Sequence, residues 1–216
     1  MARTLVIATR NRKKFEEMVA ILAGLDVALK SLEEFGDVAT VPETGGTFEE
    51  NARAKALGYA KATGEWALAD DSGLDVDALG GKPGVLSSRW GGQEGNDARN
   101  NRALLEALAE HPEESWTARY RCVTALAKHP KKTWTARYRC VVALATPDRV
   151  LLVAEGACEG RITDRPAGSN GFGYDPYFWV PEYGRTMAEL TPETKNRLSH
   201  RGQALEAMKE GLRKLL

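Results

Sequence analysis

Apolar and polar positions along the first half of the chain follow two periods in turn. Short apolar runs, which are typical of buried strands, are followed by segments whose apolar residues recur every three or four positions, as on one helix face. The predicted strands are residues 4–9, 26–32 and 66–70, and the predicted helices are residues 15–24, 47–63 and 97–109. Residues 36–46 and 80–95 are rich in Gly and predict loops. This alternation of strands and helices predicts an α/β domain.

The second half of the chain predicts a β-hairpin and a helical C-terminus. The residues Thr146-Pro147-Asp148-Arg149 form a predicted turn between two β-rich segments, and residues 168–180 predict a glycine-rich loop that enters an apolar strand. A helical region begins at Thr191-Pro192, with Thr as the N-cap and Pro at the first helical position. Its second part runs from about Ser199 to Leu215 and carries its apolar residues along one face.

An 18-residue segment occurs twice in succession in the middle of the chain. Residues 107–124 read ALAEHPEESWTARYRCVT and residues 125–142 read ALAKHPKKTWTARYRCVV, which are identical at 13 of 18 positions (ALA, HP and WTARYRCV). Three Glu residues of the first copy are Lys in the second. Because a solenoid needs three or more units to bury its faces, two copies predict a local tandem duplication inside one domain, residues 1–216.

Each copy of WTARYRCV alternates in the manner of a strand. The second copy leads directly to the hairpin turn, so we expect it to keep the hairpin strand while the first copy adds or displaces a neighbouring strand. In the alternative, the first copy holds that strand and the second bulges out. The sequence alone does not choose between them.

The composition and the net charge of the chain indicate which kinds of molecule it can bind. Hydrophobic residues make up 43% of the chain and charged residues 28%, as in an ordinary globular protein. Thirty basic and thirty acidic residues cancel, which does not resemble the basic surface of a nucleic-acid-binding protein. We therefore expect no nucleic-acid partner, and any polyanion must be bound by a local cluster of Lys and Arg.

Cysteine usage and the N-terminal segment indicate the compartment. The three cysteines form no CxxC pair, and an odd count gives no regular disulfide framework, so a reduced cytoplasmic protein is the expectation. The N-terminus lacks the long apolar region of a signal peptide. No apolar run approaches the roughly 18 to 20 residues that span a bilayer, and we expect no membrane association.

A basic segment between the first strand and the first helix is a candidate anion site. Backbone N–H groups and the positive end of a helix dipole point at an anion in this position, and Lys neutralises its charge. The alternative is an ordinary solvated basic turn, and the segment lacks the Walker A pattern. The candidate residues are Thr9, Arg10, Asn11, Arg12, Lys13 and Lys14.

An acidic segment follows the strand at residues 66–70 and predicts a metal site. Asp70 and Asp71 begin the expected acidic turn at residues 70–73, and hard cations such as Mg²⁺ prefer carboxylate oxygens. Glu43 and the pair Glu49/Glu50 are candidates to complete the site. Strand alternation places Asp70 and Asp71 on opposite faces, so we expect one of them to face the substrate. A solvated acidic turn is the alternative.

Two later segments offer contacts for a ring and for polar ligand atoms. In Gly171-Phe172-Gly173-Tyr174-Asp175-Pro176, glycines beside aromatic rings suit a purine pocket, although a turn that feeds a core strand would look the same. Lys195 and the run Ser199-His200-Arg201 carry donors for a base carbonyl or a phosphate. A lone His is more often a structural residue.

Taken together and in this order, these segments resemble the Ham1-like inosine/xanthosine triphosphate pyrophosphatases. The resemblance is carried by ATRNRKK, FEENARAKA, ALADDSGLDVDALGGKPGV, SNGFGYDP and KNRLSHRGQAL, and it covers almost the whole chain except the stretch near residues 107–133. It implies an elongated α/β fold of two lobes around a central mixed sheet, with the active cleft between the lobes, and a homodimer.

The resemblance also implies an activity and a set of site residues. The family hydrolyses ITP, dITP and XTP to the monophosphate and pyrophosphate with Mg²⁺, which clears deaminated purines from the nucleotide pool. Residues 9–14 would then bind the triphosphate, Glu43 and Asp71 would hold Mg²⁺, and Asp71 would also activate water. The implied nucleotide contacts are Ser72, Phe172, Gly173, Tyr174, Asp175, Lys195, His200 and Arg201.

Two departures and two alternatives accompany this resemblance. Lys13 stands where the family often has Gly, and the repeat adds residues to the middle of the sheet. One alternative function is that of a Maf-type pyrophosphatase, which prefers other modified nucleotides. The other is a catalytically silent nucleotide-binding or scaffolding protein.

Overall fold

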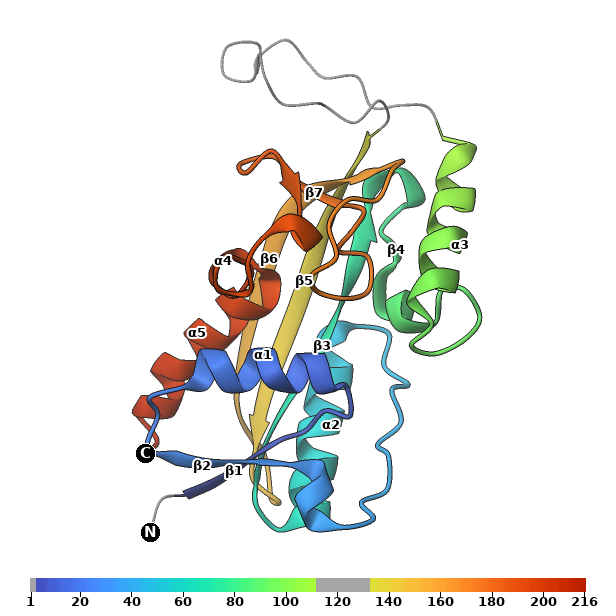
Figure 1. Ribbon diagram of the computed structural model, residues 1–216. Coiled ribbons are helices and arrows are strands. Elements are labelled where there is room, and N and C mark those ends of the chain that lie inside the picture. The colour runs from blue at the N-terminus through green and yellow to red at the C-terminus, as the bar shows by residue number, and fades with distance from the viewer. Residues whose placement is uncertain (1–2, 112–132) are drawn as a thin grey trace. The chain divides into compact units, whose positions relative to one another are not determined.

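The computed structural model describes residues 3–111 and 133–216, and it shows a central mixed sheet flanked by helices (Figure 1). The strands are β1 (Arg3–Ile7), β2 (Val27–Ser31), β3 (Trp66–Val76), β4 (Lys82–Pro83), β5 (Thr133–Ala145), β6 (Val150–Thr163), β7 (Phe178–Val180) and β8 (Arg185–Thr186). The helices are α1 (Arg12–Leu22), α2 (Phe48–Thr63), α3 (Asp97–Ala109), α4 (Pro192–Leu198) and α5 (His200–Arg213). The α/β class predicted from the sequence is confirmed.

In the described part of the chain, eight strands form one sheet in the order β2-β1-β3-β5-β6-β7-β8, with β4 paired to β3. Strand β1 is parallel to both β2 and β3, whereas β4 is antiparallel to β3, and β7 is antiparallel to β6 and β8. The sheet is therefore mixed. Among the described residues, no helix has both the length and the apolar composition needed to cross a membrane.

The chain divides into two compact units, and β3, β5 and β6 contribute residues to both. The first unit contains Met1–Ser72, Arg139–Cys158 and Asn196–Leu216, and the second contains Gly73–Tyr138 and Glu159–Lys195. Each unit carries part of the residues that the sequence singled out.

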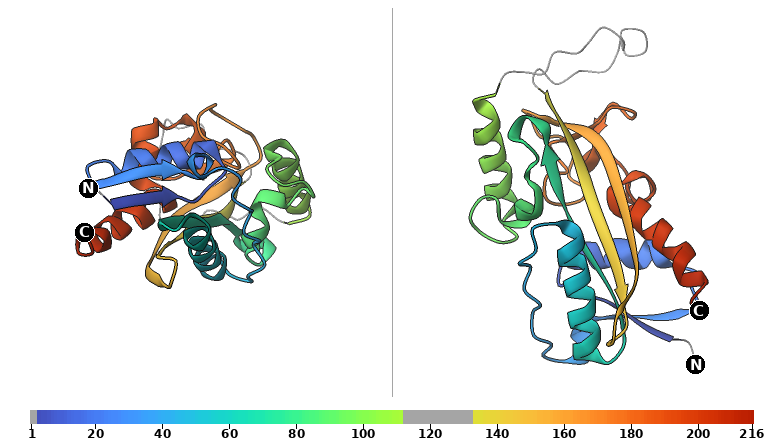
Figure 2. Two further views of the ribbon diagram at one scale, coloured as in Figure 1. Left: turned by 90° about the horizontal axis from the view of Figure 1, so that it is seen from below. Right: turned by 180° about the vertical axis from the view of Figure 1, so that it is seen from behind.

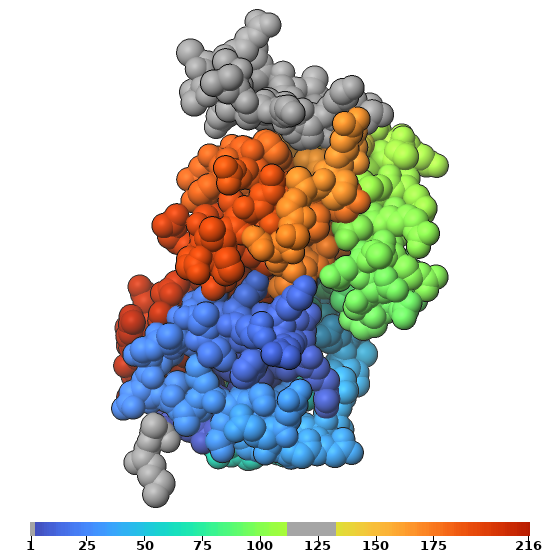
Figure 3. Space-filling model, in the orientation of Figure 1, coloured from blue at the N-terminus to red at the C-terminus, as the bar shows by residue number. Residues whose placement is uncertain are grey.

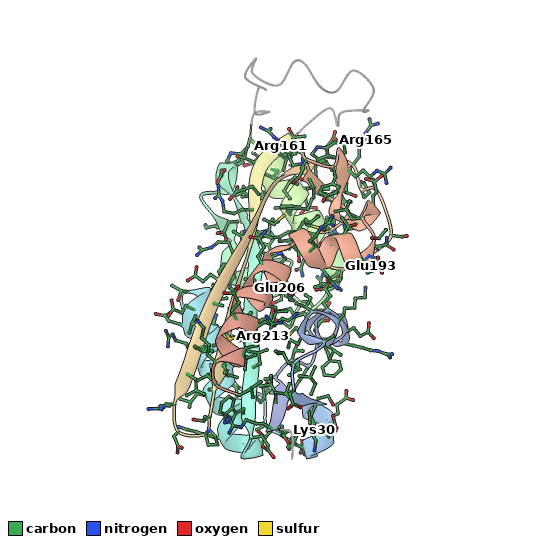
Figure 4. All side chains as sticks on the ribbon, turned by 90° about the vertical axis from the view of Figure 1, so that its left-hand side faces the viewer. Lys30, Arg161, Arg165, Glu193, Glu206 and Arg213 are labelled. Atoms are coloured by element: carbon green, nitrogen blue, oxygen red, sulfur yellow. The ribbon has the colours of Figure 1, made fainter. Side chains whose placement is uncertain are left out.

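In the first unit, α1 and α5 pack on one face of the strands and α2 covers the other face (Figure 2). Figure 3 shows the α5 surface beside the surface of the N-terminal third. The core residues of the α1/α5 face are Leu5, Ile7, Met18, Ile21, Leu22, Leu68, Cys140, Val142, Leu144, Ala204, Leu205, Met208 and Leu212. The opposite side of α5 is polar, and Glu206 and Arg213 lie on its outward surface (Figure 4).

In the second unit, aromatic side chains pack around β5, β6 and β7. The rings of Tyr138 and Phe178 are stacked with their centroids 4.2 Å apart. The hydroxyl of Tyr174 donates a hydrogen bond to the backbone carbonyl of Ser87 over 2.9 Å. Burial raises the pKa of Tyr174, so this hydroxyl keeps its proton and remains a donor. These contacts hold the loop before β7 against the preceding strand and 3₁₀ segment.

The helix caps agree with the sequence signals. Thr47 and Glu50 form the capping box of α2, and Ser199 accepts a hydrogen bond from the third residue of α5. Gly24, which follows the C-cap residue Ala23 of α1, has a φ of 84°, a conformation that favours glycine after a helix.

Two expectations about loops are wrong. Residues 70–73 do not form a turn, because β3 continues through them to Val76. Residues 80–95 are not loop throughout, since they contain β4 and a 3₁₀ helix at Gly84–Arg89. In both places short polar or glycine-rich stretches look like turns, but strand pairing and packing against buried neighbours override that local signal.

The second copy of the repeat forms the hairpin strand, as preferred from the sequence. Residues 133–142 of that copy lie in β5, which the turn at residues 146–149 joins to β6. Residues 107–109 of the first copy end α3. Residues 112–124 of the first copy, and with them the strand that we expected from it, lie outside the described residues.

The close packing of β6 on α5 gives a test of the first unit. A Cβ added at Gly156 would lie 2.6 Å from the backbone nitrogen of Ala204 and would also collide with the backbone carbonyl of His200. We expect Gly156→Ala to lower the free energy of unfolding by about 1–3 kcal/mol, because backbone atoms of a helix cannot yield to it. Urea unfolding followed by circular dichroism measures this.

Gly46→Ala is the matched control. A Cβ at Gly46 would find Glu50 at 3.8 Å, an ordinary contact, so the expected change is within about 0.5 kcal/mol. Equal effects of the two variants would contradict the packing of β6 on α5.

Candidate functional site

The segment before α1 is ordered by its own side chains. The side-chain oxygen of Asn11 accepts hydrogen bonds from the backbone N–H groups of Lys13 (3.0 Å) and Lys14 (3.2 Å), which makes Asn11 the N-cap of the helix. Thr9 in turn accepts from the N–H of Asn11 at 3.2 Å. Lys13 is the second residue of α1, and no described residue other than glycine has a positive φ. Lys13 therefore adopts an ordinary helical backbone conformation without strain.

The basic side chains of this segment point to different partners. Arg12 forms an exposed ion pair with Glu16, and Arg10 donates to the backbone carbonyl of Val38. Lys14 instead reaches the interior, where its ammonium lies 3.0 Å from Oδ2 of Asp70. The structure thus separates Lys14 from the solvent-exposed cations.

Lys14, Glu17, Asp70, Ser72 and Arg201 form what we call the Asp70 cluster. Oδ2 of Asp70 accepts hydrogen bonds from Lys14, from the hydroxyl of Ser72 at 3.1 Å, and from Nε and NH2 of Arg201 at 3.3 and 3.2 Å. Arg201 also donates to Glu17 at 2.7 Å and to Ser72 at 2.9 Å. Separate segments of the first unit therefore converge on one buried carboxylate.

The charges of this cluster decide how it titrates. Burial alone would raise the pKa of Asp70, but the cations of Lys14 and Arg201 outweigh it and hold that pKa far below its usual range. Burial alone would lower the pKa of Arg201, but Asp70 and Glu17 outweigh it and raise that pKa. Burial raises the pKa of Cys140, in the core beneath, to about 12. The ion pair is thus fully charged at neutral pH, and the thiol is not.

Arg201 and His200 lie at the first turn of α5 and are both buried. The guanidinium of Arg201 is only 2% exposed and is held by protein oxygens. The reading of a purine carbonyl by His200 and Arg201 stays a prediction.

Glu43, Asn51, Lys55 and Asp71 form a second group, the Asp71 cluster. The ammonium of Lys55 lies 2.6 Å from Glu43 and 3.4 Å from Oδ1 of Asp71. The other carboxylate oxygen of Asp71 accepts a hydrogen bond from the side-chain amide of Asn51 at 2.9 Å. Asp71 thus has different partners from Asp70, as expected for neighbours on a strand, and the two carboxylates serve separate clusters.

Burial and charge act in opposite directions on the Asp71 cluster. Burial raises the pKa of Asp71 and the Glu43 carboxylate adds to this, while Lys55 and Asn51 only partly offset them. Burial alone would lower the pKa of Lys55, but Asp71, Asp70 and Glu43 outweigh it and raise that pKa. A buried carboxylate with a raised pKa is a better proton acceptor near neutral pH than an ordinary Asp.

The donor set of the Asp71 cluster fits a hard divalent cation. Within residues 3–111 and 133–216, no three or more His, Cys, Asp or Glu side chains are grouped so as to hold a metal by themselves. Mg²⁺ is commonly bound by one or two carboxylates together with substrate phosphates. Glu43 and Asp71 converge on the single ammonium of Lys55, so two carboxylate oxygens already face one cationic group.

The other acidic candidates lie elsewhere. Glu49 forms an ion pair with Arg53 at 2.7 Å on the surface of α2, and Glu50 completes the capping box with Thr47. The expectation that Glu49 or Glu50 completes the acidic site is therefore wrong. Their position in the first turn of a helix explains this, because carboxylates there satisfy backbone N–H groups.

In the second unit, Tyr138, Phe172, Asp175 and Lys195 form the Asp175 cluster. Oδ2 of Asp175 accepts from the ammonium of Lys195 at 2.7 Å and from the backbone N–H of Phe172 at 2.9 Å. Oδ1 accepts from the hydroxyl of Tyr138 at 3.2 Å. The ammonium of Lys195 lies 4.6 Å from the centroid of the Phe172 ring. The cluster thus fixes an aromatic ring and a cation side by side.

The glycine between these residues is held by α3. The N–H of Gly173 donates to Asp97 at 2.8 Å, and its carbonyl accepts from the side chain of Asn101 at 2.9 Å. Gly173 has a φ of 64°, which favours glycine at this turn. Residues 171–175 are therefore positioned by side chains from several elements of the second unit.

Sequence reasoning missed several of these positioning residues. Asn51 and Lys55 are four residues apart on α2, so they share one helix face, and this spacing could have identified them within FEENARAKA. Glu17, Asp97 and Tyr138 contact the clusters from elements far away in the sequence. No local pattern signals them.

Comparison with known protein families shows to which family the chain belongs. A model described as the Ham1 family matches residues 5–136 and 128–211. The chain belongs to the Ham1 family. Its relatives in this family include the dITP/XTP pyrophosphatase of Geobacter sulfurreducens (strain ATCC 51573 / DSM 12127 / PCA), 49% identical over 208 residues that cover 96% of each chain. The dITP/XTP pyrophosphatase of Geobacillus kaustophilus (strain HTA426) is 45% identical over 96% of this chain and 93% of its own.

Solved structures of Ham1 proteins share the fold. A HAM1 protein from Coxiella burnetii is 41% identical and superimposes with a TM-score of 0.81, covering 98% of this chain and 99% of its own. The Ham1 protein of Staphylococcus aureus is 34% identical, with a TM-score of 0.80 over 99% of this chain and 100% of its own.

The ionised state of Asp70 gives a stability prediction for this Ham1 protein. Removing one partner of a buried ion pair leaves uncompensated charge, so Asp70→Asn should lower the free energy of unfolding by about 3 kcal/mol at pH 7. The folded-state pKa of Asp70 is lowered, so this contribution is present above the unfolded pKa of about 3.9 and is lost as the pH falls below it. Urea unfolding at pH 7, 5, 4 and 3 measures the difference.

Asp26→Asn is the control, since Asp26 is exposed. The Asp26→Asn substitution should change the free energy of unfolding only slightly at every pH. A difference between parent and Asp70→Asn that stays constant from pH 7 to pH 3 would show that the Asp70 charge does not stabilise the fold.

Proposed function

We propose that this protein hydrolyses non-canonical purine nucleoside triphosphates, namely ITP, dITP and XTP, to the monophosphate and pyrophosphate. The single observation that carries the proposal is the pair of buried carboxylate–lysine clusters around Asp70 and Asp71 in a Ham1 chain. Relatives named dITP/XTP pyrophosphatases, 43–49% identical over nearly the full chain, support it.

In this proposal the first unit binds the triphosphate. Residues 9–14 supply the N-terminus of α1 and the ammonium of Lys14 for phosphate oxygens. Lys14 contacts Asp70, so it is already directed away from bulk solvent by that carboxylate. Ser72 is fixed beside it by Asp70 and Arg201 and is proposed as a further contact to the nucleotide.

Asp71 is the proposed general base. It takes a proton from a water molecule, the water oxygen bonds to the α-phosphorus, and the bond from that phosphorus to the α–β bridging oxygen breaks, so that pyrophosphate leaves with the bonding electrons. Glu43 and Asp71 would hold Mg²⁺, which supplies charge neutralisation of the phosphates when bound. Lys55 and Asn51 orient the Asp71 carboxylate for this task.

The proposed base contacts come from aromatic and cationic side chains. Phe172 offers a ring for stacking on a purine, and Gly173, Tyr174 and Asp175 complete its loop, with Lys195 beside it. His200 and Arg201 are proposed to favour a 6-oxo purine, because donors aimed at O6 would be left unpaired against the amine of adenine.

Further expectations about the whole molecule remain proposals. We propose a homodimer, a single Ham1 domain over residues 1–216 and a tandem duplication at residues 107–142, the last supported by the 13 identical positions. A cytoplasmic location is proposed because the substrate pool is intracellular and because three cysteines give no regular disulfide framework.

The activity predicts a defined substrate preference. Pyrophosphate release with Mg²⁺ should be faster from ITP than from ATP by at least about 100-fold in kcat/KM, because unpaired buried donors discriminate strongly. Asp71→Asn should reduce kcat for ITP by at least about 100-fold, the usual contribution of a general base. A coupled pyrophosphate assay measures both.

Asp148→Asn is the control, since Asp148 is exposed in the β5–β6 turn. The kcat and kcat/KM of this variant for ITP should match those of the parent. Preference for other modified nucleotides over ITP would favour a Maf-type function. A folded parent that binds ITP without releasing pyrophosphate would favour the silent nucleotide-binding protein and refute the proposed activity.

Lys14 predicts an effect on triphosphate affinity. Lys14→Gln should raise KM for ITP about tenfold or more, because hydrogen bonds to charged groups are worth about 1.5–3 kcal/mol. Lys61→Gln removes an exposed Lys at the end of α2 and should leave KM at the parent value. Steady-state kinetics, with thermal melting to confirm folding, test this. Equal KM values for Lys14→Gln and the parent would remove Lys14 from the proposed site.

A further inference from the structure

One residue of the repeated segment contacts a loop that the proposed function uses. Tyr138 lies in β5 within the second copy of WTARYRCV, and its hydroxyl donates a hydrogen bond of 3.2 Å to Oδ1 of Asp175. Tyr138 is 6% exposed and Asp175 is 4% exposed, so the bond is shielded from water. No sequence motif of the family resemblance includes Tyr138.

The ring of Tyr138 is held independently of its hydroxyl. It stacks on Phe178, which is fully buried, with centroids 4.2 Å apart and an interplanar angle of 28°. This packing fixes the direction in which the hydroxyl points. The hydroxyl can therefore be removed without removing the ring that fills the core.

The hydrogen bond determines the orientation of the Asp175 carboxylate. With Oδ1 bound to Tyr138, Oδ2 faces both the N–H of Phe172 at 2.9 Å and the ammonium of Lys195 at 2.7 Å. That ammonium also lies over the Phe172 ring. Rotation of the carboxylate would weaken both contacts at once, and the Tyr138 hydroxyl is the group that holds Oδ1 against such a rotation.

We propose that Tyr138 is a positioning residue for nucleotide binding, which acts through Asp175 on Phe172 and Lys195. This inference rests on the proposed function, since it takes Phe172 and Lys195 as nucleotide contacts. Because Tyr138 acts on binding groups and not on the Asp71 base, its loss affects affinity and leaves the chemical step unchanged.

The chain contains its own matched control. Tyr120 occupies the same place in an identical octapeptide, residues 116–123, as Tyr138 does in residues 134–141. Tyr120→Phe and Tyr138→Phe therefore remove the same atom from the same local sequence. Only Tyr138 is proposed to position the Asp175 carboxylate for nucleotide binding.

The experiment measures kcat and KM for ITP, the Kd of the product IMP, and hydrogen exchange of the Phe172 amide. Tyr138→Phe should raise KM and Kd about three- to tenfold, which is less than the full contribution of one hydrogen bond to a charged group because Tyr138 does not contact the nucleotide itself, with kcat within about twofold of the parent. The Phe172 amide should exchange faster. Tyr120→Phe should match the parent in every measurement.

A double-mutant cycle links the effect to Asp175. In an Asp175→Asn background, Tyr138→Phe should change KM less than it does in the parent, because the two groups interact directly. Full additivity of the two changes would place the effect of Tyr138 elsewhere and overturn the proposal.

Three further results of these measurements would overturn the role proposed for Tyr138. Unchanged KM and unchanged amide exchange in Tyr138→Phe would overturn the proposal, as would a loss of affinity in Tyr120→Phe instead. A fall in kcat at constant KM would assign Tyr138 to the chemical step and overturn it too. A parent that neither binds IMP nor releases pyrophosphate would refute the proposed function, and the role of Tyr138 in binding with it. Amide exchange would in that case still report whether Tyr138 orders the loop.

Discussion

The first unit depends on one buried carboxylate oxygen, Oδ2 of Asp70. It accepts hydrogen bonds from Lys14 on α1, from Ser72 on its own strand and from Arg201 on α5. A buried charge is costly unless its partners are in place, so any packing of these elements that separated Asp70 from Lys14 and Arg201 would be strongly disfavoured. The N-terminal basic segment and the C-terminal SHRG segment, which are far apart in the sequence, are thereby tied to the same strand.

In the second unit, Asp175 is likewise a buried carboxylate that accepts several hydrogen bonds, but fewer of its partners are charged. It pairs with one buried Lys and accepts two further hydrogen bonds from neutral groups, a backbone N–H and a tyrosine hydroxyl. In both units, then, the cations that the proposed function assigns to the nucleotide are already held by carboxylates. Such preorganisation reduces the side-chain entropy lost when a ligand binds.

The sequence predicts the fold well where local signals and packing agree. The α2 helix, with the capping box at Thr47, and the N-cap at Ser199 were predictable because the cap and the apolar face coincide. The segment at residues 70–73 was not, because its polar side chains look like a turn while their long-range partners hold them in a strand. Tyr138 and Glu17 were hidden for the same reason, since their roles come from contacts across the fold.

The two copies of WTARYRCV show that the sequence of a segment does not by itself determine whether it forms the hairpin strand. Two identical octapeptides have the same propensities, so the choice of hairpin strand must come from the residues that flank them. After the second copy, the hydroxyl of Thr146 accepts hydrogen bonds from the N–H groups of Asp148 and Arg149, and the N–H of Thr146 donates to the carbonyl of Arg149. This local turn joins β5 to β6. The corresponding residues after the first copy are Lys128-His129-Pro130-Lys131, which lack the Thr and Asp on which that turn depends. The turn sequence thus favours the second copy as the hairpin strand, and with it Tyr138 as the tyrosine that reaches Asp175.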